Sequence, residues 1–511
     1  MRLGELLGDV ARRAPAVLGQ GTPGEAPFGG GPHARIEVSA IAHDHREVAP
    51  GTLFVARRGE RHDAHDHLVE AAERGAVAAI GEREAPGLQL PYLVVPDARR
   101  ALPHLAAAFY AHPSERLRVI GVTGTDGKTT TSYLLHWLLA LRFTTGLVST
   151  AGIRLGAPEG AGDQPADDRV FQLAGHFTTP EATDVQRLLS AFATGGASHA
   201  VLESSSHGFS LNRLDAVAYD VGIVTNLSSE HLDHHGSMAE YLAAKATLVE
   251  RARLSHLNLD DPHHPAFAAA ARAAGNTLRG YGESPGADLR IGAVSDVRGG
   301  LRFTLARGDA EVEVQLPMIG RYNAWNAAAA VAAASEEGIG IEEAAARLAL
   351  FPGVPGRMQL IAAEPFTVVV DFAHTAPALA KALAAVRPAV GRVVVVIGAA
   401  GERDPGKRAP LGAAAVRGAD LVVFTEEDSR SEPFAAIADE LVRGAQDAGG
   451  RRGSDFVVVA ERERAIATAL AAAREGDVVL LAGKGHERTL ERADQVIDWD
   501  EAALTRRLLD G

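Results

Sequence analysis

Apolar residues in the first part of the chain form short runs that alternate with alanine-rich helical patterns. Thr52–Ala56 and Tyr92–Val95 are typical of strands, whereas the glycine- and proline-rich segment Gly19–Gly31 is typical of a loop. A new unit is predicted to begin at Leu117, where the buried-strand pattern LRVIGVT precedes a loop and a helical pattern. These patterns predict a small N-terminal α/β domain over residues 1–115.

Strand and helix patterns alternate through the middle of the chain, which favours a parallel α/β sheet. His199–Glu203 and Val221–Asn226 have strand patterns, and Met238–Ala252 has a helical one. Upstream of them, Gly156–Asp168 has the composition of a flexible excursion.

The segment Asp288–Leu316 differs from its surroundings because its apolar residues alternate with period two. Within it, Arg298-Gly299-Gly300 is a hairpin signal. We expect a β-rich excursion here, followed by a helix over Ala324–Glu337. The central domain is predicted to cover residues 116–356.

The last part of the chain is predicted to be a third domain, residues 357–511, after a linker at Phe351–Met358 that holds two prolines and two glycines. Four buried-strand patterns follow, and each ends at a polar loop: TVVVDFAH, GRVVVVIGAAG, ADLVVFTEE and GDVVLLAGKG. Such a series predicts a Rossmann-like α/β domain, whose ligands bind at the carboxyl ends of the strands.

Composition excludes several classes of protein. The 511 residues include 51 Lys+Arg and 65 Asp+Glu, a formal net charge of −14, which argues against a general nucleic-acid-binding protein. The absence of cysteine excludes disulfides, thiolate metal sites and thiol nucleophiles. No segment approaches the roughly 18 apolar residues of a membrane span. Glu5 and Asp9 interrupt the N-terminal apolar run, so we expect a cytoplasmic protein without a signal peptide.

The segment Gly121–Thr129, GVTGTDGKT, has the pattern of a phosphate-binding loop between a strand and a helix. Glycines let backbone N–H groups approach phosphates, and the start of a helix favours an anion. Lys128 would reach the β- and γ-phosphates and Thr129 would hold Mg²⁺. The usual spacing puts glycine at position 122, where this chain has Val122. The pattern predicts nucleotide binding and leaves the reaction open.

Further polar clusters follow predicted strands downstream. ESSSH begins at Glu203, directly after Leu202, and NLSSEHLDHHG contains His231. A carboxylate and an imidazole near the phosphates could complete the coordination of Mg²⁺. Taken singly, Glu203 could equally cap a helix, the histidines could lie in a solvated loop, and Lys245 could be an ordinary surface lysine. The histidine-rich stretch Arg61–His67 offers no matching partner cluster, so we expect a solvated loop there.

Together these motifs resemble the muramyl (Mur) ligase family, and specifically its tripeptide-synthetase (MurE-type) members. The resemblance covers the chain from about Asp44 to the C-terminus. Its motifs, in family order, are Asp44-His45-Arg46, VTGTDGKTTT, Thr178-Thr179-Pro180, ESSSH, NLSSEHLDHHG, AAK at Lys245, NLDDP, RYNAWNAAAA, GVPGRM, DFAHT, GERDPGKR, SRSEP and GKGHE.

The resemblance implies an ATP-dependent ligase with a role for each matching position. Lys128, Glu203, His231 and Lys245 would be catalytic, and Thr129, Glu203, His231 and Lys245 would hold two Mg²⁺ ions, with Lys245 carried as a carbamate. The implied ATP-binding residues are Gly124, Thr125, Gly127, Lys128, Thr129, Thr130, Asn323, Asn326, Arg357, Asp371 and His374. ATP would lie between the second and third domains, with Phe351–Met358 as a hinge.

The resemblance also implies two sets of substrate contacts. Arg46, Thr178, Thr179, Ser205 and Arg213 match positions that bind the UDP-muramoyl substrate. Arg403, Glu427, Asp428, Arg430, Gly483 and Glu487 match the pocket of the incoming amino acid. The implied partners are UDP-N-acetylmuramoyl-dipeptide and a basic diamino acid, with no nucleic acid and no membrane, and the implied state is a monomer. The implied process is cytoplasmic peptidoglycan synthesis, and with it cell shape and division.

Three departures from the family pattern bear on specificity. Asp-Ser-Arg becomes Asp44-His45-Arg46, and a glutamine two residues before the substrate arginine becomes Leu211. The Asp-Asn-Pro-Arg signature of diaminopimelate-adding members becomes Glu427-Asp428-Ser429-Arg430, which keeps an acidic site and a carboxylate-binding arginine. Meso-diaminopimelate, L-lysine and L-ornithine all remain candidate substrates.

Two alternatives remain open. A sister ligase of the same fold, either MurF-type or a folylpolyglutamate synthase, would share the ATP site, although GERDPGKR and GKGHE favour the tripeptide synthetase. A non-catalytic phosphate-loop module would bind nucleotide without acceptor-dependent turnover.

Overall fold

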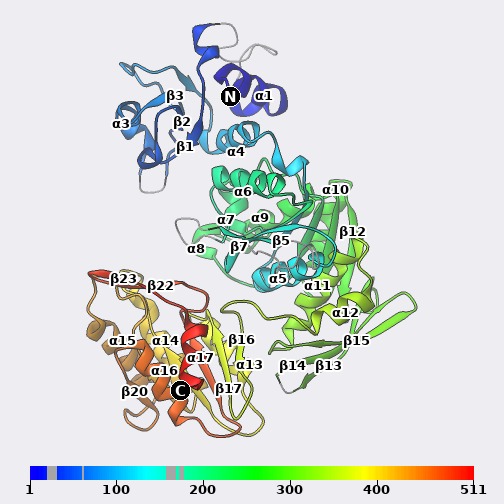
Figure 1. Ribbon diagram of the computed structural model, residues 1–511, viewed down its shortest axis with the longest axis vertical. Coiled ribbons are helices and arrows are strands. Elements are labelled where there is room, and N and C mark those ends of the chain that lie inside the picture. The colour runs from blue at the N-terminus through cyan, green and yellow to red at the C-terminus, as the bar shows by residue number, and fades with distance from the viewer. Residues whose placement is uncertain (20–30, 60–61, 157–168, 172–177, 298, 511) are drawn as a thin grey trace. The chain divides into compact units, whose positions relative to one another are not determined.

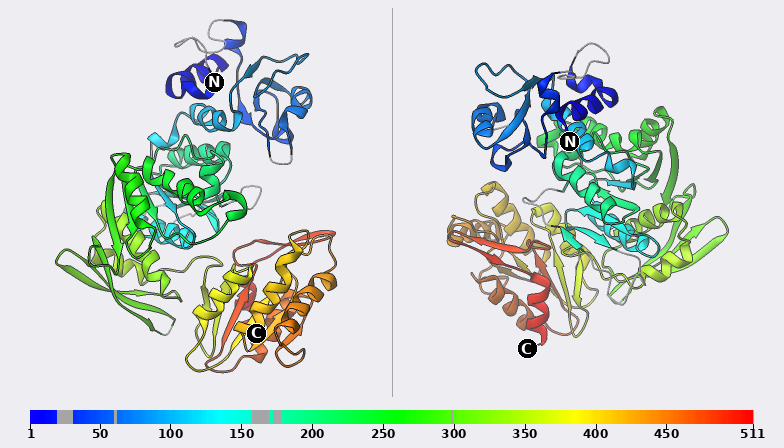
Figure 2. Two further views of the ribbon diagram at one scale, coloured as in Figure 1. Left: turned by 180° about the vertical axis from the view of Figure 1, so that it is seen from behind. Right: turned by 45° about the horizontal axis from the view of Figure 1, so that its top comes forward.

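The structure is a computed structural model that describes residues 1–19, 31–59, 62–156, 169–171, 178–297 and 299–510. The chain forms two compact units (Figures 1 and 2). The first comprises Met1–Lys128 and Leu139–Gly280, and the second comprises Thr129–Leu138 and Tyr281–Gly511.

The N-terminal part of the first unit is a small parallel sheet with helices packed against it. Its strands pair in the order β1 (Ala40–Ala42), β2 (Thr52–Val55), β3 (Ala76–Gly81) and β4 (Tyr92–Val94). The helices are α1 (Leu3–Arg13), α2 (Pro15–Leu18), α3 (Leu68–Glu73) and α4 (Ala98–Phe109). Leu3, Leu6 and Leu7 of α1 share a core with Leu102 and Leu105 of α4 because apolar residues recur at helical spacing on both.

The rest of the first unit contains a parallel sheet centred on β5 (Arg118–Thr123). Its strands run in the order β11 (Leu254–Asn258), β10 (Val221–Val224), β5, β9 (His199–Glu203), β6 (Thr145–Ser149), β7 (Gly152–Gly156) and β8 (Arg169–Phe171), and only β7 and β8 are antiparallel. The helices here are α6 (Ala182–Thr194), α7 (Ser206–Ser210), α8 (Leu232–His235), α9 (Met238–Arg251) and α10 (His264–Ala273). β5, β9 and β10 lie side by side, so the polar loops that follow them share one sheet edge.

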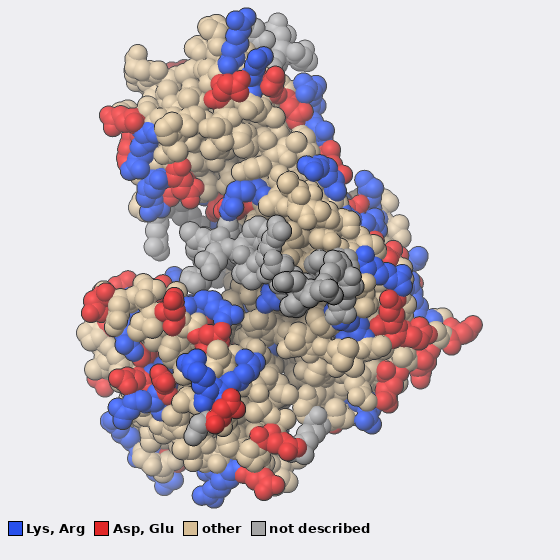
Figure 3. Space-filling view, viewed as in Figure 1, with Lys and Arg blue, Asp and Glu red and all other residues tan. Residues whose placement is uncertain are grey.

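The second unit contains most of α5 (Lys128–Leu139), the helix that starts at the end of the phosphate-loop motif. A β-rich segment follows in this unit. β12 (Thr277–Gly282) pairs in parallel with β13 (Leu289–Val297), and β14 (Gly300–Arg307) and β15 (Ala310–Leu316) continue as antiparallel hairpins. The helices α11 (Tyr322–Glu336) and α12 (Ile341–Leu348) follow. Figure 3 shows acidic side chains at the tip of this excursion, where Asp309, Glu311 and Glu313 are exposed.

The C-terminal part of the second unit is a six-stranded sheet in the order β16 (Gln359–Ala362), β17 (Thr367–Asp371), β21 (Val478–Ala482), β18 (Val393–Ile397), β19 (Leu421–Phe424) and β20 (Phe456–Val458). All pairs except β16–β17 are parallel. The helices are α13 (Ala376–Val386), α14 (Arg408–Gly418), α15 (Phe434–Asp447), α16 (Arg462–Ala472) and α17 (Glu501–Asp510), and β22 (Thr489–Arg492) and β23 (Gln495–Asp498) form a hairpin. Short 3₁₀ turns, η1 to η5, complete the elements: Pro32–Arg35, His45–Glu47, Ala64–His67, Pro113–Glu115 and Pro405–Lys407.

The predicted fold class is confirmed, since the patterned strands and helices form within a few residues of their predicted ends. The predicted β-rich excursion is also present, with Val297 paired to Gly300. Most of the predicted loop Gly19–Gly31, most of the excursion Gly156–Asp168, and Arg61 and Arg298 lie outside the described residues. In the part of the chain that the structure describes, no helix combines the length and apolarity that crossing a membrane requires.

Candidate active site

The predicted phosphate loop joins β5 to α5 and depends on two glycines with positive φ. Gly124 has φ +146° and Gly127 has φ +83°. A Cβ on Gly124 would lie 1.8 Å from Oγ1 of Thr225, so no other residue fits there without displacing the neighbouring strand end. Val122, at the position where the usual motif has glycine, is a buried residue of β5. The departure in spacing therefore falls in the strand and leaves the loop intact.

Two lysines donate to the same carbonyl of this loop. Nζ of Lys128 lies 3.0 Å from the oxygen of Gly124 and 2.8 Å from that of Thr125. Nζ of Lys245, from α9, lies 2.6 Å from the oxygen of Gly124 and 4.5 Å from the centre of the Tyr241 ring. The sequence placed these lysines 117 positions apart, and the fold brings them together at one peptide group.

Lys245 is buried rather than exposed on a helix surface, with 1% of its surface accessible. Burial and the positive charge of Lys128 hold the pKa of Lys245 well below its usual range. Among the described residues, it forms no ion pair. A lysine in this setting is favoured as the neutral amine, the nucleophilic form.

Glu203 lies at the end of β9, next to the phosphate-loop strand, and is buried. Its Oε2 accepts hydrogen bonds from Oγ of Ser149 at 2.6 Å and from the backbone N–H of Thr150 at 2.9 Å. These contacts, which the sequence did not indicate, orient the carboxylate at the carboxyl edge of the sheet. Glu203 and Lys128 are both among the charges that act on Lys245, so three of the four predicted catalytic residues belong to one cluster.

His231 caps α8 with left-handed backbone (φ +55°) and belongs to a group of aromatic rings. Its ring centre lies 4.9 Å from that of His207 and 6.3 Å from that of Tyr241, the ring beneath Lys245. His207 also stacks on His234 at 4.1 Å. Burial, followed by the three neighbouring histidines, lowers the pKa of His207 to about 4, so this group contains neutral imidazole at neutral pH.

Thr129 and Thr130 begin the second unit and are buried in the first turn of α5. The hydroxyl of Thr131, one residue on, donates to Oδ1 of Asn326 at 3.4 Å, and Nδ2 of Asn326 donates to Oδ1 of Asn323 at 2.8 Å. Both asparagines are buried on α11. Their side-chain amides therefore form a short polar chain that leads to the first turn of α5.

Of the residues predicted to contact the UDP-muramoyl substrate, Thr179, Ser205 and Arg213 are joined by hydrogen bonds, whereas Arg46 lies outside this group and pairs with Asp44. Oγ1 of Thr179 lies 2.9 Å from Oγ of Ser205, and Nη1 of Arg213 donates to the carbonyl of Thr179 at 2.9 Å. Thr178 is half-buried beside them. Arg46 is exposed and pairs with Asp44 at 2.5 Å, which holds the pKa of Asp44 well below its usual range. No hydrogen bond or ion pair between the described residues joins Arg46 to the Thr179 group.

Two residues that the motifs did not indicate complete the Arg213 site. Glu181 accepts Arg213 at 2.7 Å through one oxygen and Arg57 at 2.8 Å through the other. Burial raises the pKa of Glu181, but Arg57 and Arg213 overcome this and lower it below the usual value. The pattern TTPE contained Glu181, but only the fold brings Arg57, 124 residues away, to it.

The remaining predicted ATP-binding residues of the second unit lie around Asp371. Its two carboxylate oxygens accept the N–H groups of Met358 and Ala373 at 2.8 and 2.9 Å, and burial raises its pKa. The guanidinium of Arg357 lies 4.8 Å from the centre of the Phe372 ring, and His374 packs against the same ring at 4.6 Å. Asp371 therefore fixes the GVPGRM segment, and the two basic side chains flank one aromatic ring.

The predicted amino-acid pocket contains a buried cation that sequence reasoning missed. Lys484, fully buried, pairs with Oδ1 of Asp428 at 2.8 Å and with Oε2 of Glu487 at 2.7 Å. Glu427 is also buried, and its Oε2 has no hydrogen-bond partner among the described residues. Burial raises the pKa of Glu427 to about 7. The signal for Lys484 was present in GKGHE, but a lysine between two glycines gave no hint of its two partners.

Glycine is required at position 483 because a Cβ there would lie 2.8 Å from Oε2 of Glu427, on a backbone with φ +100°. Arg430, predicted to bind a carboxylate, already has one: its Nε lies 2.9 Å from Glu491, and its Nη1 donates to the carbonyl of Gly401 at 2.7 Å. Arg403 is exposed. Among the described residues, no hydrogen bond or ion pair links Arg403 to the pocket carboxylates.

The histidine-rich stretch is not the solvated loop that was expected, and that prediction was wrong. His65 is buried; its Nδ1 lies 2.6 Å from Asp63, and its Nε2 accepts the N–H of Glu82 at 2.8 Å. His67 stacks on His45 with ring centres 3.8 Å apart. The sequence did not indicate this partner of His67, because His45 belongs to a different turn of the chain, η2.

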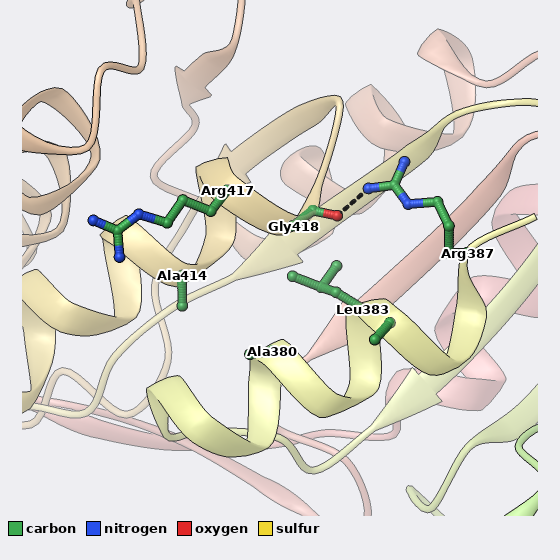
Figure 4. A pocket seen from close by; sticks show the side chains of 7 residues that line it. Ala380, Leu383, Arg387, Ala414, Arg417 and Gly418 are labelled. Atoms are coloured by element: carbon green, nitrogen blue, oxygen red, sulfur yellow. Dashed lines mark hydrogen bonds between the residues drawn. The ribbon is translucent and has the colours of Figure 1, made fainter.

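A hollow of about 530 Å³ between α13 and α14 lies apart from all the predicted site residues (Figure 4). Arg387 donates to the carbonyl of Gly418 at its edge. The lining residues are Ala380, Leu383, Ala384, Arg387, Ala414, Arg417 and Gly418. The lining holds no carboxylate, histidine or hydroxyl, so we assign the chemistry to the clusters above.

Comparison with known proteins identifies the family of the chain. Sequence profiles described as Mur ligase family, catalytic domain, as Mur ligase middle domain, and as Mur ligase, glutamate ligase domain match residues 37–110, 122–334 and 356–485. A UDP-N-acetylmuramyl-tripeptide synthetase from Deinococcus radiodurans is 46% identical over 94% of this chain and 96% of its own length. A UDP-N-acetylmuramoyl-L-alanyl-D-glutamate–2,6-diaminopimelate ligase from Streptomyces coelicolor is 37% identical over 94% of each chain.

Solved structures support the same assignment. A structure titled as a UDP-N-acetylmuramoyl-L-alanyl-D-glutamate–2,6-diaminopimelate ligase has a TM-score of 0.65 and 27% identity, over 100% of this chain and 99% of that one. The MurF ligase of Thermotoga maritima in complex with ADP shares the fold, with a TM-score of 0.57 and 21% identity over 88% of this chain and 94% of that one. This chain belongs to the Mur ligase family.

Proposed function

We propose that this protein is an ATP-dependent ligase that adds a basic diamino acid to UDP-N-acetylmuramoyl-L-alanyl-D-glutamate in peptidoglycan precursor synthesis. The observation that carries the proposal is the convergence of Lys128 and Lys245 on the carbonyl of Gly124, beside Glu203. The relative at 46% identity is named a tripeptide synthetase, and the relative at 37% identity is named a diaminopimelate ligase.

The proposed ligase divides its work among three domains. Residues 1–115 would hold the UDP end of the muramoyl substrate, residues 116–356 would bind ATP, and residues 357–511 would bind the amino acid. The profile matches at 37–110, 122–334 and 356–485 support these boundaries.

The first proposed step transfers the γ-phosphoryl group of ATP to the substrate carboxylate, releasing ADP and leaving an acyl phosphate. Lys128 and the N–H groups of the Gly124–Gly127 loop would neutralise and hold the transferred group. The donor set of Thr129, Glu203, His231 and a carbamylated Lys245 is suited to Mg²⁺, because hydroxyl and carboxylate oxygens predominate in it. Bound Mg²⁺ would supply charge neutralisation at the phosphates.

Carbamylation of Lys245 is supported by its setting. A neutral lysine amine attacks CO₂, forming an N–C bond and releasing a proton, which leaves a carbamate anion in place of the amine. Lys245 is buried against Tyr241 and near Lys128, and both features favour the neutral amine. The product would carry negative charge close to the phosphate loop, where a cation is needed.

In the second proposed step the amine of the diamino acid attacks the acyl carbon, the amide bond forms, and phosphate and a proton leave. Of the three predicted acidic residues, Asp428 and Glu487 already pair with Lys484, whereas Glu427 has a buried carboxyl oxygen without a hydrogen-bond partner among the described residues, which suits a cationic distal amine. Arg430, which would take a distal carboxylate, already pairs with Glu491. These contacts favour L-lysine or L-ornithine over meso-diaminopimelate.

Phosphate release with UDP-N-acetylmuramoyl-L-alanyl-D-glutamate, ATP and each of the three amino acids tests the proposal. We expect turnover with at least one of them, and higher kcat/KM for lysine or ornithine than for diaminopimelate. Preference for diaminopimelate would overturn the ranking, and turnover with none of the three would overturn the function. A folate acceptor with glutamate, and the muramoyl-tripeptide with D-Ala-D-Ala, test the sister ligases in the same assay.

A further inference from the structure

Three side chains of metal-binding type meet on the surface of the N-terminal part, and the proposed reaction assigns no step to them, although His45 adjoins Arg46 of the predicted substrate contacts. They come from three elements: His45 from η2, His67 from the end of η3, and Glu70 from α3. Nε2 of His45 lies 3.6 Å from Oε2 of Glu70, and Nδ1 of His67 lies 3.4 Å from the same oxygen. All three ligand atoms lie within 4.8 Å of one another, and all three residues are half-buried.

Neighbouring charges orient these side chains. Arg74 donates from Nε and Nη2 to Oε1 of Glu70, at 3.1 and 2.9 Å, so the other oxygen, Oε2, is directed at the two rings. Asp44 lies 3.7 Å from Nδ1 of His45, on the side of the ring away from Glu70. A carboxylate behind a histidine, and a second contact behind a carboxylate, are the outer contacts that metal ligands commonly have.

We propose that His45, His67 and Glu70 form a binding site for a divalent transition-metal ion of the Zn²⁺ type. Two imidazoles and one carboxylate form a ligand set that such ions accept, with water in the remaining position. Zn²⁺ with ligands at about 2.0–2.1 Å needs ligand atoms about 3.4 Å apart in a tetrahedral arrangement. Both distances to Glu70 already match this spacing.

One local movement is required for binding. The rings of His45 and His67 stack with planes 8° apart, and ring lone pairs lie in the ring plane. Turning one ring about its Cβ–Cγ bond aims both nitrogens at one ion, and this breaks the stack. The bound ion would tie η2 to η3 and α3, and thereby stabilise the N-terminal part independently of ATP or the muramoyl substrate.

Metal titration of the full chain in buffer with excess Mg²⁺ tests the site. We expect one Zn²⁺ per chain at micromolar concentration, measured by competition with a chromophoric chelator, and a visible absorption spectrum with Co²⁺. Zn²⁺ should also raise the Tm by about 2–4 °C, as a ligand of the folded state does in a chain of this size. Failure to bind Zn²⁺ at about 100 times the protein concentration would overturn the proposal.

Variants locate the ion. His45→Ser and His67→Ala should each weaken Zn²⁺ binding at least tenfold, since outer contacts alone account for about 10–100-fold. Glu70→Gln should weaken it as well. Glu73→Gln, on the same helix but exposed and outside the cluster, is the matched control and should bind as the unchanged chain does. One Zn²⁺ retained at unchanged affinity in His45→Ser and His67→Ala would place the ion elsewhere, for example at His207 and His234, and refute the site. The Tm of each variant without Zn²⁺ shows that it is folded.

Discussion

The two units each contain a fully buried lysine, and the two lysines have opposite surroundings. Lys245, beside the phosphate loop, contacts a backbone carbonyl and an aromatic ring and has Lys128 nearby. Lys484, in the amino-acid pocket, contacts the carboxylates of Asp428 and Glu487. Their accessible surfaces differ by only a percentage point, at 1% and 0%. Burial alone therefore says little about what a lysine does.

The charged groups beside each lysine determine whether its ammonium form is favoured. Removing an ammonium from water disfavours its charged form, and only a nearby negative charge offsets that penalty. None of the described carboxylates forms an ion pair with Lys245, and Glu230, Asp126 and Glu203 offset burial and Lys128 only in part, so its pKa falls. A lowered pKa suits the reaction as an amine that we propose for it. Lys484 has two partners, which suits a fixed positive charge that holds two carboxylates in place. The same degree of burial thus occurs with a lowered pKa in one unit and with two ion pairs in the other.

The largest expected effect is on stability when the paired lysine is removed. Lys484→Met leaves buried Asp428 and partly buried Glu487 without their cation, and breaking such a pair costs about 3–5 kcal/mol. Urea unfolding followed by fluorescence measures the loss. The matched variant Lys245→Met leaves no such pair broken and should cost less than half as much. Equal losses in both variants would contradict the distinction between the two lysines.

The next effect is on turnover when the unpaired lysine is removed. Lys245→Ala should lower kcat about 100-fold, or about 2.7 kcal/mol, because the proposed carbamate ligand of Mg²⁺ is lost, and with it neutralisation of the transferred phosphoryl group. Added acetate or formate should restore part of the activity if a carbamate normally occupies the position. Lys245→Arg keeps a positive charge but cannot form the carbamate, so near-normal activity in that variant would refute the carbamate.

The smallest effect concerns Glu427, the buried carboxyl close to Lys484. Its pKa in the folded chain, about 7, lies above the usual 4.5. The folded state therefore holds this proton more tightly than the unfolded state. The resulting stability is full below about pH 4.5 and is lost as the pH rises towards 7. From pH 5 to pH 7.5 the loss should be about 2 kcal/mol.

Glu427→Gln isolates that contribution, because glutamine has nearly the same shape and does not titrate. Urea unfolding at pH 5 and pH 7.5 should show a stability difference smaller by about 2 kcal/mol in the variant than in the unchanged chain. The positive charges of Lys484 and of Arg462, a fully buried residue of α16, favour the ionised form of Glu427. Parallel pH dependence in the two proteins would show that these charges keep Glu427 ionised throughout, and would contradict the contrast between paired and unpaired groups.

Much of the fold could be predicted because apolar periodicity is a local property. β5, β9 and β21 follow directly from runs of Val, Ile and Leu, and the turn at Gly124 follows from its glycines. The types of chemistry were also readable, since Lys128, Glu203 and Lys245 lie in recognisable motifs. What could not be read was pairing, such as Arg57 with Glu181 across 124 positions. Hydrophobic periodicity carries no information about which charges meet.

The histidine-rich stretch shows the same limit. His62, His65 and His67 looked alike in sequence, yet His65 became a buried residue held by Asp63 and Glu82, while His67 met His45 and Glu70. The difference arises because η3 turns the His65 side chain inward and the His67 side chain outward, towards His45 of η2, which lies 22 residues earlier in the chain.

By itself the sequence determined the α/β architecture, the β-rich excursion, the phosphate loop and the family. These depend on the spacing of apolar residues, on glycines at positive φ, and on motifs read along the chain. Only the tertiary structure decided that Lys245 lies on the carbonyl of Gly124, that Lys484 neutralises Asp428, and that Arg430 pairs with Glu491. Electrostatic character depends on distance and burial in space, and neither is set until the strands and helices have packed.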